Sequence, residues 1–136
     1  MRWRCGWRMT AEGPSPARVR RGARNFAAGL AAEEAVVRHY EARGAPVAER
    51  RWRGGGAEID LIAREGGTVV FVEVKRAATH ARAAESLRPA QMARLMAAAA
   101  AFLADEPCGQ DSPARFDVAL VDGTGAVEVL ENALGA

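Results

Sequence analysis

Long apolar runs, cysteine and histidine are scarce in this 136-residue sequence. Without about 18 consecutive apolar residues, or an apolar stretch behind the arginine-rich start, neither a membrane span nor a secretory leader is expected. The two cysteines, Cys5 and Cys108, form no CxxC, and His39 and His80 are the only histidines. A zinc site or a disulfide framework is therefore not expected. These absences favour a cytoplasmic protein that does not associate with membranes.

Lysine is also nearly absent. Of 19 basic residues, 18 are arginine and one, Lys75, is lysine. Lysine carries a compact charge on a flexible stem, whereas arginine carries a planar fork that stays protonated. A lone lysine placed at random among the basic positions would fall on its strand motif about one time in twenty. The position of Lys75 therefore favours a special role without proving one.

The remaining composition, 49% hydrophobic and 26% charged, is typical of one globular domain with one core. The net charge is +2, but residues 1–24 carry seven arginines against one acid, Glu12. A basic arm of this kind would suit a polyanion, and an incidental disordered extension explains it equally well. We predict an irregular, disordered arm over residues 1–22 and a single domain over residues 23–136.

Hydrophobic periodicity and turn signals predict seven elements in the order α-β-β-β-α-β-β. The helices cover 24–43 and 89–105, and the strands cover 46–52, 57–64, 68–76, 115–121 and 126–130. Residues 77–88 are expected to form a loop, which contains His80. Because a strand, a helix and a further strand imply a crossover, we expect an α/β fold with a mixed β-sheet flanked by helices.

The second and third strands form a predicted hairpin around Gly66 and Gly67. If the turn is centred between these glycines, Asp60 lies opposite Glu73 and Glu58 lies opposite Lys75. All four side chains then share one face with Ile62 and Phe71. The other face would carry five apolar residues, namely Ile59, Leu61, Val70, Val72 and Val74.

Two opposed carboxylates repel each other unless a cation neutralises them. The oxygens of Asp60 and Glu73 would suit Mg²⁺ or Mn²⁺, with substrate phosphate completing the coordination, and Lys75 would orient water or phosphate oxygens. This pattern points to phosphodiester hydrolysis. The alternative is the wet face of an ordinary antiparallel sheet, with Glu58 and Lys75 as a cross-strand ion pair.

The segments Glu58-Ile59-Asp60-Leu61-Ile62-Ala63 and Val70-Phe71-Val72-Glu73-Val74-Lys75 resemble the YraN family of bacterial predicted endonucleases. That family is similar to Holliday-junction resolvases and belongs to the PD-(D/E)XK superfamily, whose core is restriction-endonuclease-like. The resemblance runs from about Gly29 to Glu131-Asn132-Ala133 and includes Arg51-Trp52-Arg53 and Arg115-Phe116-Asp117-Val118, as structural or nucleic-acid-contacting segments.

The resemblance implies a metal-binding role for Asp60, the acid and lysine of an E-x-K signature at Glu73 and Lys75, and a further metal-binding acid at Glu33. Ala57 and Ala32 stand where the family has glycine. Gln91 lies about where many members have lysine, which puts one phosphate contact in doubt.

The resulting hypothesis is a Mg²⁺- or Mn²⁺-dependent endonuclease acting on DNA, for which branched or damaged DNA is a candidate substrate. A two-fold homodimer would suit junction cleavage. Further nucleic-acid contacts are expected from Arg51, Arg53, Arg76, Gln91 and Arg94, although an exposed charged surface is the default for the arginines. Trp52 is expected to pack inside the fold rather than stack on a base. The alternative function is a non-catalytic nucleic-acid-binding or scaffolding protein on the same fold.

Overall fold

The structure is a computed structural model that describes the backbone of residues 16–133 and the side chains of residues 27–133. The elements are α1 (Pro16–Ala42), β1 (Val47–Gly54), β2 (Ala57–Glu65), β3 (Thr68–Arg76), α2 (His80–Glu85), α3 (Pro89–Leu103), a 3₁₀ helix η1 (Gly109–Asp111), β4 (Ala114–Val121) and β5 (Val127–Leu130). The sheet has the order β1-β2-β3-β4-β5, with β3 parallel to β4 and the other neighbours antiparallel. The predicted α/β fold with a mixed sheet is confirmed.

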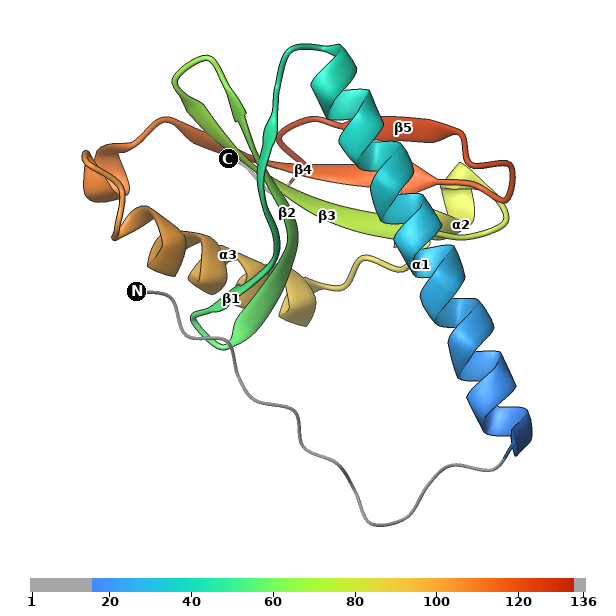
Figure 1. The fold of residues 1–136 in the computed structure, drawn as a ribbon. Helices are drawn as coiled ribbons and strands as arrows, with labels where there is room; N and C mark the ends of the chain where they lie inside the picture. Colours follow the sequence, from blue (N-terminus) through green and yellow to red (C-terminus); the bar gives the residue numbers. More distant parts are fainter. Residues whose placement is uncertain (1–15, 134–136) are drawn as a thin grey trace.

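Helices cover both faces of the sheet (Figure 1). On one face, α1 buries an apolar stripe that includes Val36 and Tyr40 against Leu61 and Val72. On the other face, α3 packs on an apolar cluster that includes Ile62 and Phe71, which we call the α3 cluster. Beside it, α2 packs on Val118 and Leu120 of β4. The sheet is therefore apolar on both sides, as a central sheet in an α/β protein must be.

The β2–β3 hairpin has the predicted register from its turn to Leu61, which lies opposite Val72, with Ile62 opposite Phe71. The ladder ends there, so the predicted strand pairing does not extend to Asp60 and Glu73 or to Glu58 and Lys75. The predicted faces hold for the four paired residues, because Leu61 and Val72 face α1 while Ile62 and Phe71 face α3. Ile59 is an exception: it was expected beside Leu61 but packs in the α3 cluster. Its β1 neighbour Trp52 follows Arg51, whose φ of 51° interrupts the regular alternation of an extended strand.

The start of the first helix differs from the prediction. Helix α1 begins at Pro16 rather than Arg24, so residues 16–22 of the expected irregular arm are helical. Proline suits a first helical turn because the N–H that it lacks has no partner there. Residues 1–15, the rest of that arm, lie outside the described residues. Among the residues that the structure describes, no helix is both long and apolar enough to cross a membrane.

The segment expected to be a loop over residues 77–88 contains the short helix α2. Thr79 caps this helix, because its Oγ1 accepts a hydrogen bond from the backbone N–H of Arg82 at 3.2 Å. His80 lies in the first turn, where its ring contacts Asp122 and Glu128. A capping residue followed by alanine-rich sequence was the overlooked helix signal.

Candidate metal site where two strands separate

Strands β2 and β3 separate at Asp60. Their paired residues run from the turn to Leu61 and Val72, after which β2 curves away with β1 while β3 continues beside β4 (Figure 1). At the separation, Asp60 Oδ2 accepts a hydrogen bond of 2.8 Å from the backbone N–H of Val74. This carboxylate takes the place of a strand carbonyl, so the backbone of β3 fixes its position.

Glu73 lies next to Asp60 and is only 6% exposed. The two side chains are hydrogen-bonded to each other. Burial, and then the charge of Asp60, raise the pKa of Glu73 to about 8, although Lys75 opposes the shift. Burial also raises the pKa of Asp60, while the Val74 N–H acts in the opposite direction. The pair therefore disfavours two negative charges and would gain from an added cation.

Lys75 and Gln91 complete one side of this acidic pair. Lys75 Nζ lies 3.5 Å from Glu73 Oε1 and donates a hydrogen bond of 2.9 Å to Gln91 Oε1. Gln91, in the first turn of α3, donates from Nε2 to Glu73 Oε1 at 3.2 Å. Glu58, the other cross-strand partner considered for Lys75, instead pairs with Arg53 at 3.4 Å. Lys75 thus belongs to the acidic pair rather than to an ordinary surface ladder.

Glu33 approaches the same place from α1. Its charge contributes to the raised pKa of Asp60, which makes the two carboxylates neighbours. Its oxygens, however, are engaged by Arg51, with Nη2 at 3.1 Å and Nε at 3.4 Å. Among residues 27–133, no three Asp, Glu, His or Cys side chains form a group that could hold a metal ion. The structure therefore brings Asp60 and Glu73 together and leaves Glu33 beside Arg51.

Three further arginines were predicted to contact nucleic acid. Arg53 and Arg94 are exposed on β1 and α3. Arg76, also exposed, lines a cavity of about 430 Å³ between α1 and the loop that follows β4. For these three side chains, contact with nucleic acid stays a prediction. Trp52 packs edge-on against Phe102, with ring centroids 5.3 Å apart, which confirms its expected structural role.

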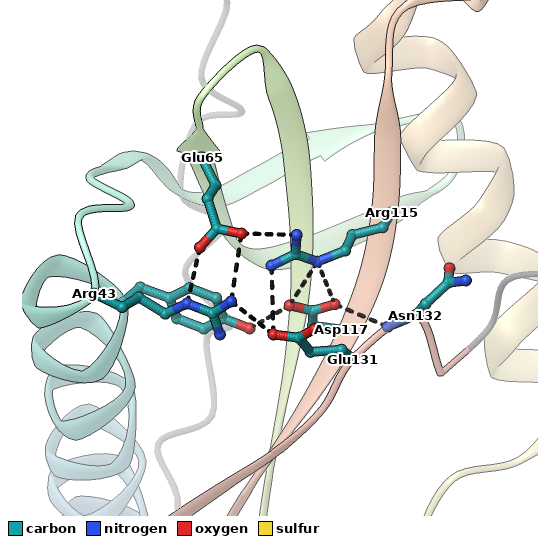
Figure 2. Close-up of polar contacts among 7 residues, drawn as sticks. Arg43, Glu65, Arg115, Asp117, Glu131 and Asn132 are labelled. Atoms are coloured by element: carbon teal, nitrogen blue, oxygen red, sulfur yellow. Dashed lines mark hydrogen bonds and ion pairs between the residues drawn. The ribbon is translucent and has the colours of Figure 1, made fainter.

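Sequence reasoning noted the segment Arg115–Val118 but missed the contacts of Asp117, which is fully buried. Asp117 accepts hydrogen bonds from Tyr40 Oη at 2.7 Å, Arg115 Nε at 3.0 Å and the backbone N–H of Asn132 at 3.0 Å (Figure 2). Burial, aided by Asp117, raises the pKa of Tyr40, so its hydroxyl stays a donor. An acid inside an otherwise apolar strand was the available signal for this buried network.

Fold and site together define an α/β protein in which helices cover both faces of a mixed sheet and an acidic pair with a lysine lies where two antiparallel strands separate. A family model described as "Uncharacterised protein family UPF0102" matches residues 32–121, and the chain belongs to this family. The match includes Glu33, Asp60, Glu73 and Lys75.

Relatives from several bacteria match most of the chain. A UPF0102 protein of Ruegeria pomeroyi is 64% identical over 115 residues, which cover 85% of this chain and 94% of the relative. One from Cereibacter sphaeroides is 57% identical over 112 residues, covering 82% and 96%. A third, from Roseobacter denitrificans, is 48% identical over 126 residues, covering 93% and 98%. The matched residues therefore cover nearly the full length of each of these relatives.

Proposed function

We propose that this protein is a metal-dependent nuclease that hydrolyses phosphodiester bonds of DNA, with Asp60 and Glu73 holding Mg²⁺ or Mn²⁺. The observation that carries the proposal is the buried carboxyl of Glu73, hydrogen-bonded to the partly buried carboxyl of Asp60, with an ammonium 3.5 Å from Glu73. The resemblance of Asp60, Glu73 and Lys75 to the E-x-K pattern of predicted endonucleases supports the same conclusion.

Among the described side chains two acids are buried, Glu73 and Asp117, and they differ in the donors and cations around them. Asp117 is surrounded by donors from Tyr40, Arg115 and the Asn132 backbone, so its charge is satisfied within the protein. Glu73 shares its surroundings with a second acid, and burial, followed by the charge of Asp60, raises its pKa to about 8. Carboxylate oxygens are hard ligands, and Mg²⁺ commonly binds through one or two of them plus substrate phosphate. A divalent cation therefore fits the Asp60–Glu73 pair.

When bound, such a metal would activate water and offset the charge that develops on the phosphate. The protein's own groups account for positioning. Asp60 is fixed by the Val74 N–H, and Lys75 is held by Gln91. The Lys75 side chain is 16% exposed and its ammonium lies at the edge of the acidic pair. From there it can orient a water molecule or a phosphate oxygen, and a compact point charge suits both tasks.

Calorimetric titration of Mn²⁺ tests the site, and cleavage of single-stranded, duplex and branched DNA tests the activity. We expect Asp60→Asn and Glu73→Gln to weaken Mn²⁺ binding at least about tenfold, because each removes a charged ligand. Lys75→Met should keep metal binding but lower the cleavage rate by about 100-fold or more, as loss of a transition-state contact does. Asp105→Asn, at an exposed position just after α3, is the matched control.

The alternative function predicts a different result. A nucleic-acid-binding or scaffolding protein would retain its affinity for DNA in EDTA and would cleave no substrate with any divalent ion. That outcome would overturn the proposed nuclease activity and leave a binding protein on this fold.

A further inference from the structure

Arg51 lies on β1 near Asp60. Its chain neighbours Arg50 and Trp52 pair with Leu61 and Ile59, the residues on either side of Asp60 in β2, and the charge of Asp60 acts on the Arg51 guanidinium. Its backbone φ of 51° lies in the left-handed region, which residues other than glycine and asparagine adopt rarely. An unfavourable backbone conformation beside a candidate site indicates a side chain whose placement matters there.

The guanidinium of Arg51 holds Glu33 with two contacts, Nη2 to Oε2 at 3.1 Å and Nε to Oε1 at 3.4 Å. The hydrogen bond with Glu33, together with the charges of Glu33, Glu58 and Asp60, raises the pKa of Arg51. Arg51 is thus a permanent cation facing three carboxylates. Both oxygens of Glu33 contact this fork, so the guanidinium competes with a metal ion for Glu33.

Charge balance at the site points the same way. With Asp60 and Glu73 ionised, as metal ligands are, these two carboxylates and Glu33 face the cations Arg51 and Lys75, which leaves one negative charge. Glu58 is balanced separately by Arg53. One divalent ion would change the net charge to plus one, which suits an anionic phosphodiester. A second divalent ion would add two further positive charges beside the fixed guanidinium, and repulsion from Arg51 opposes its binding.

We propose that this site takes a single divalent cation, because Arg51 serves as a built-in second cation that holds Glu33 outside the metal's coordination shell. The inference rests on the proposed nuclease function and concerns how its metal site is built. It assigns Arg51 a positioning role toward Glu33 rather than a contact with DNA.

The test is the number of Mn²⁺ ions bound per chain, measured by calorimetry and by the electron paramagnetic resonance signal of unbound Mn²⁺. In Arg51→Asn the guanidinium is removed, while asparagine tolerates the left-handed backbone. Arg50→Asn is the matched control, because Arg50 pairs with Glu34 and so links the same two elements one residue away. We expect one ion in the wild type and in Arg50→Asn, and two ions in Arg51→Asn.

The second ion should depend on Glu33. We expect Arg51→Asn combined with Glu33→Gln to return to one ion. Glu33→Gln alone should change the Mn²⁺ dissociation constant by less than about threefold, whereas Asp60→Asn should abolish binding. Arg51→Gly, which adopts the same φ without strain, replaces Arg51→Asn if circular dichroism shows that the asparagine variant is unfolded.

The outcomes separate this inference from the proposed function. Two ions in the wild type, or the same single ion with unchanged affinity in Arg51→Asn, would overturn the role of Arg51 and leave the metal site in place. A wild type that binds no Mn²⁺ would overturn the proposed function together with this inference.

Discussion

At the scale of single residues, the surroundings of Glu73 couple the stability of the protein to pH. Folding raises the pKa of this carboxyl from 4.5 to about 8, first through burial and then through the charge of Asp60. A carboxyl with a raised pKa keeps its proton when the chain folds. Its contribution to stability is therefore complete below about pH 4.5 and is lost as the pH rises through about 8.

We predict that, in EDTA, Glu73→Gln becomes more stable than the wild type as the pH rises from about 5 to about 9, because the amide carries no charge to bury. Since one pKa unit corresponds to about 1.4 kcal/mol, the relative gain in unfolding free energy should not exceed about 5 kcal/mol. Urea denaturation at several pH values measures it. The control is Glu34→Gln, half exposed on α1. A wild-type-to-variant difference that does not change with pH would contradict the prediction.

At the scale of elements, the β1–β2 turn is held closely against α3. A Cβ atom added at Gly55 would lie 2.6 Å from the backbone oxygen of Ala97, and Gly55 has a φ of +60°. Gly56 has a φ of +86°, but a Cβ there meets nothing within 4 Å. A substitution at Gly55 would therefore meet both a close contact and an unfavourable backbone conformation, whereas one at Gly56 would meet only the unfavourable conformation.

We predict that Gly55→Ala lowers the free energy of unfolding by about 2 to 4 kcal/mol, because both strain and a clash with α3 oppose it. Gly56→Ala carries the strain alone and should cost about 1 to 2 kcal/mol. Urea denaturation of both variants measures the difference. Equal losses would show that the turn can move away from α3 without cost.

Local sequence signals explain which elements could be predicted. The hairpin register followed from a glycine turn and alternating apolar residues, all of which lie within one short segment. The face of Ile59 could not be predicted, because it depends on the positive φ of Arg51 in the neighbouring strand. The ion pair between Arg51 and Glu33 also joins residues from separate elements, which alternation within one strand does not reveal.

The site shows the same division. Asp60, Glu73 and Lys75 lie on the two strands of a single hairpin, so their proximity could be predicted from the sequence. The hydrogen bond from Val74 N–H to Asp60 and the contacts of Gln91 arise where β2 leaves β3 and α3 arrives. These tertiary contacts determine burial and hence the raised pKa values, which sequence spacing does not encode.

At the scale of the whole molecule, the network around Asp117 connects the first helix and the segment after the last strand to β4. Asp117 on β4 contacts Tyr40 of α1 and the backbone of Asn132 after β5. Around it, Glu65 at the β2–β3 turn accepts from Arg115 at 2.8 Å and lies 2.8 Å from Arg43 Nε (Figure 2). This network lies on the α1 face of the sheet, whereas Glu73 and Lys75 face α3.

Because the network lies on the face opposite Glu73, Lys75 and Gln91, stability and metal binding should respond to different substitutions. We predict that Asp117→Asn lowers the free energy of unfolding by about 3 to 5 kcal/mol, since it leaves Arg115 without its buried partner. Tyr40→Phe removes one hydrogen bond to a charged group and should cost about 2 kcal/mol. Glu131→Gln, at the exposed rim, should cost less than about 1 kcal/mol.

In all three variants the number of bound Mn²⁺ ions and their affinity should match the wild type under conditions where the protein is folded. Denaturation and Mn²⁺ titration on the same samples make the comparison. If Asp117→Asn weakened Mn²⁺ binding as strongly as Asp60→Asn while remaining folded, the two faces would be coupled through β3 and β4, and the buried network would belong to the site rather than to the framework that supports it.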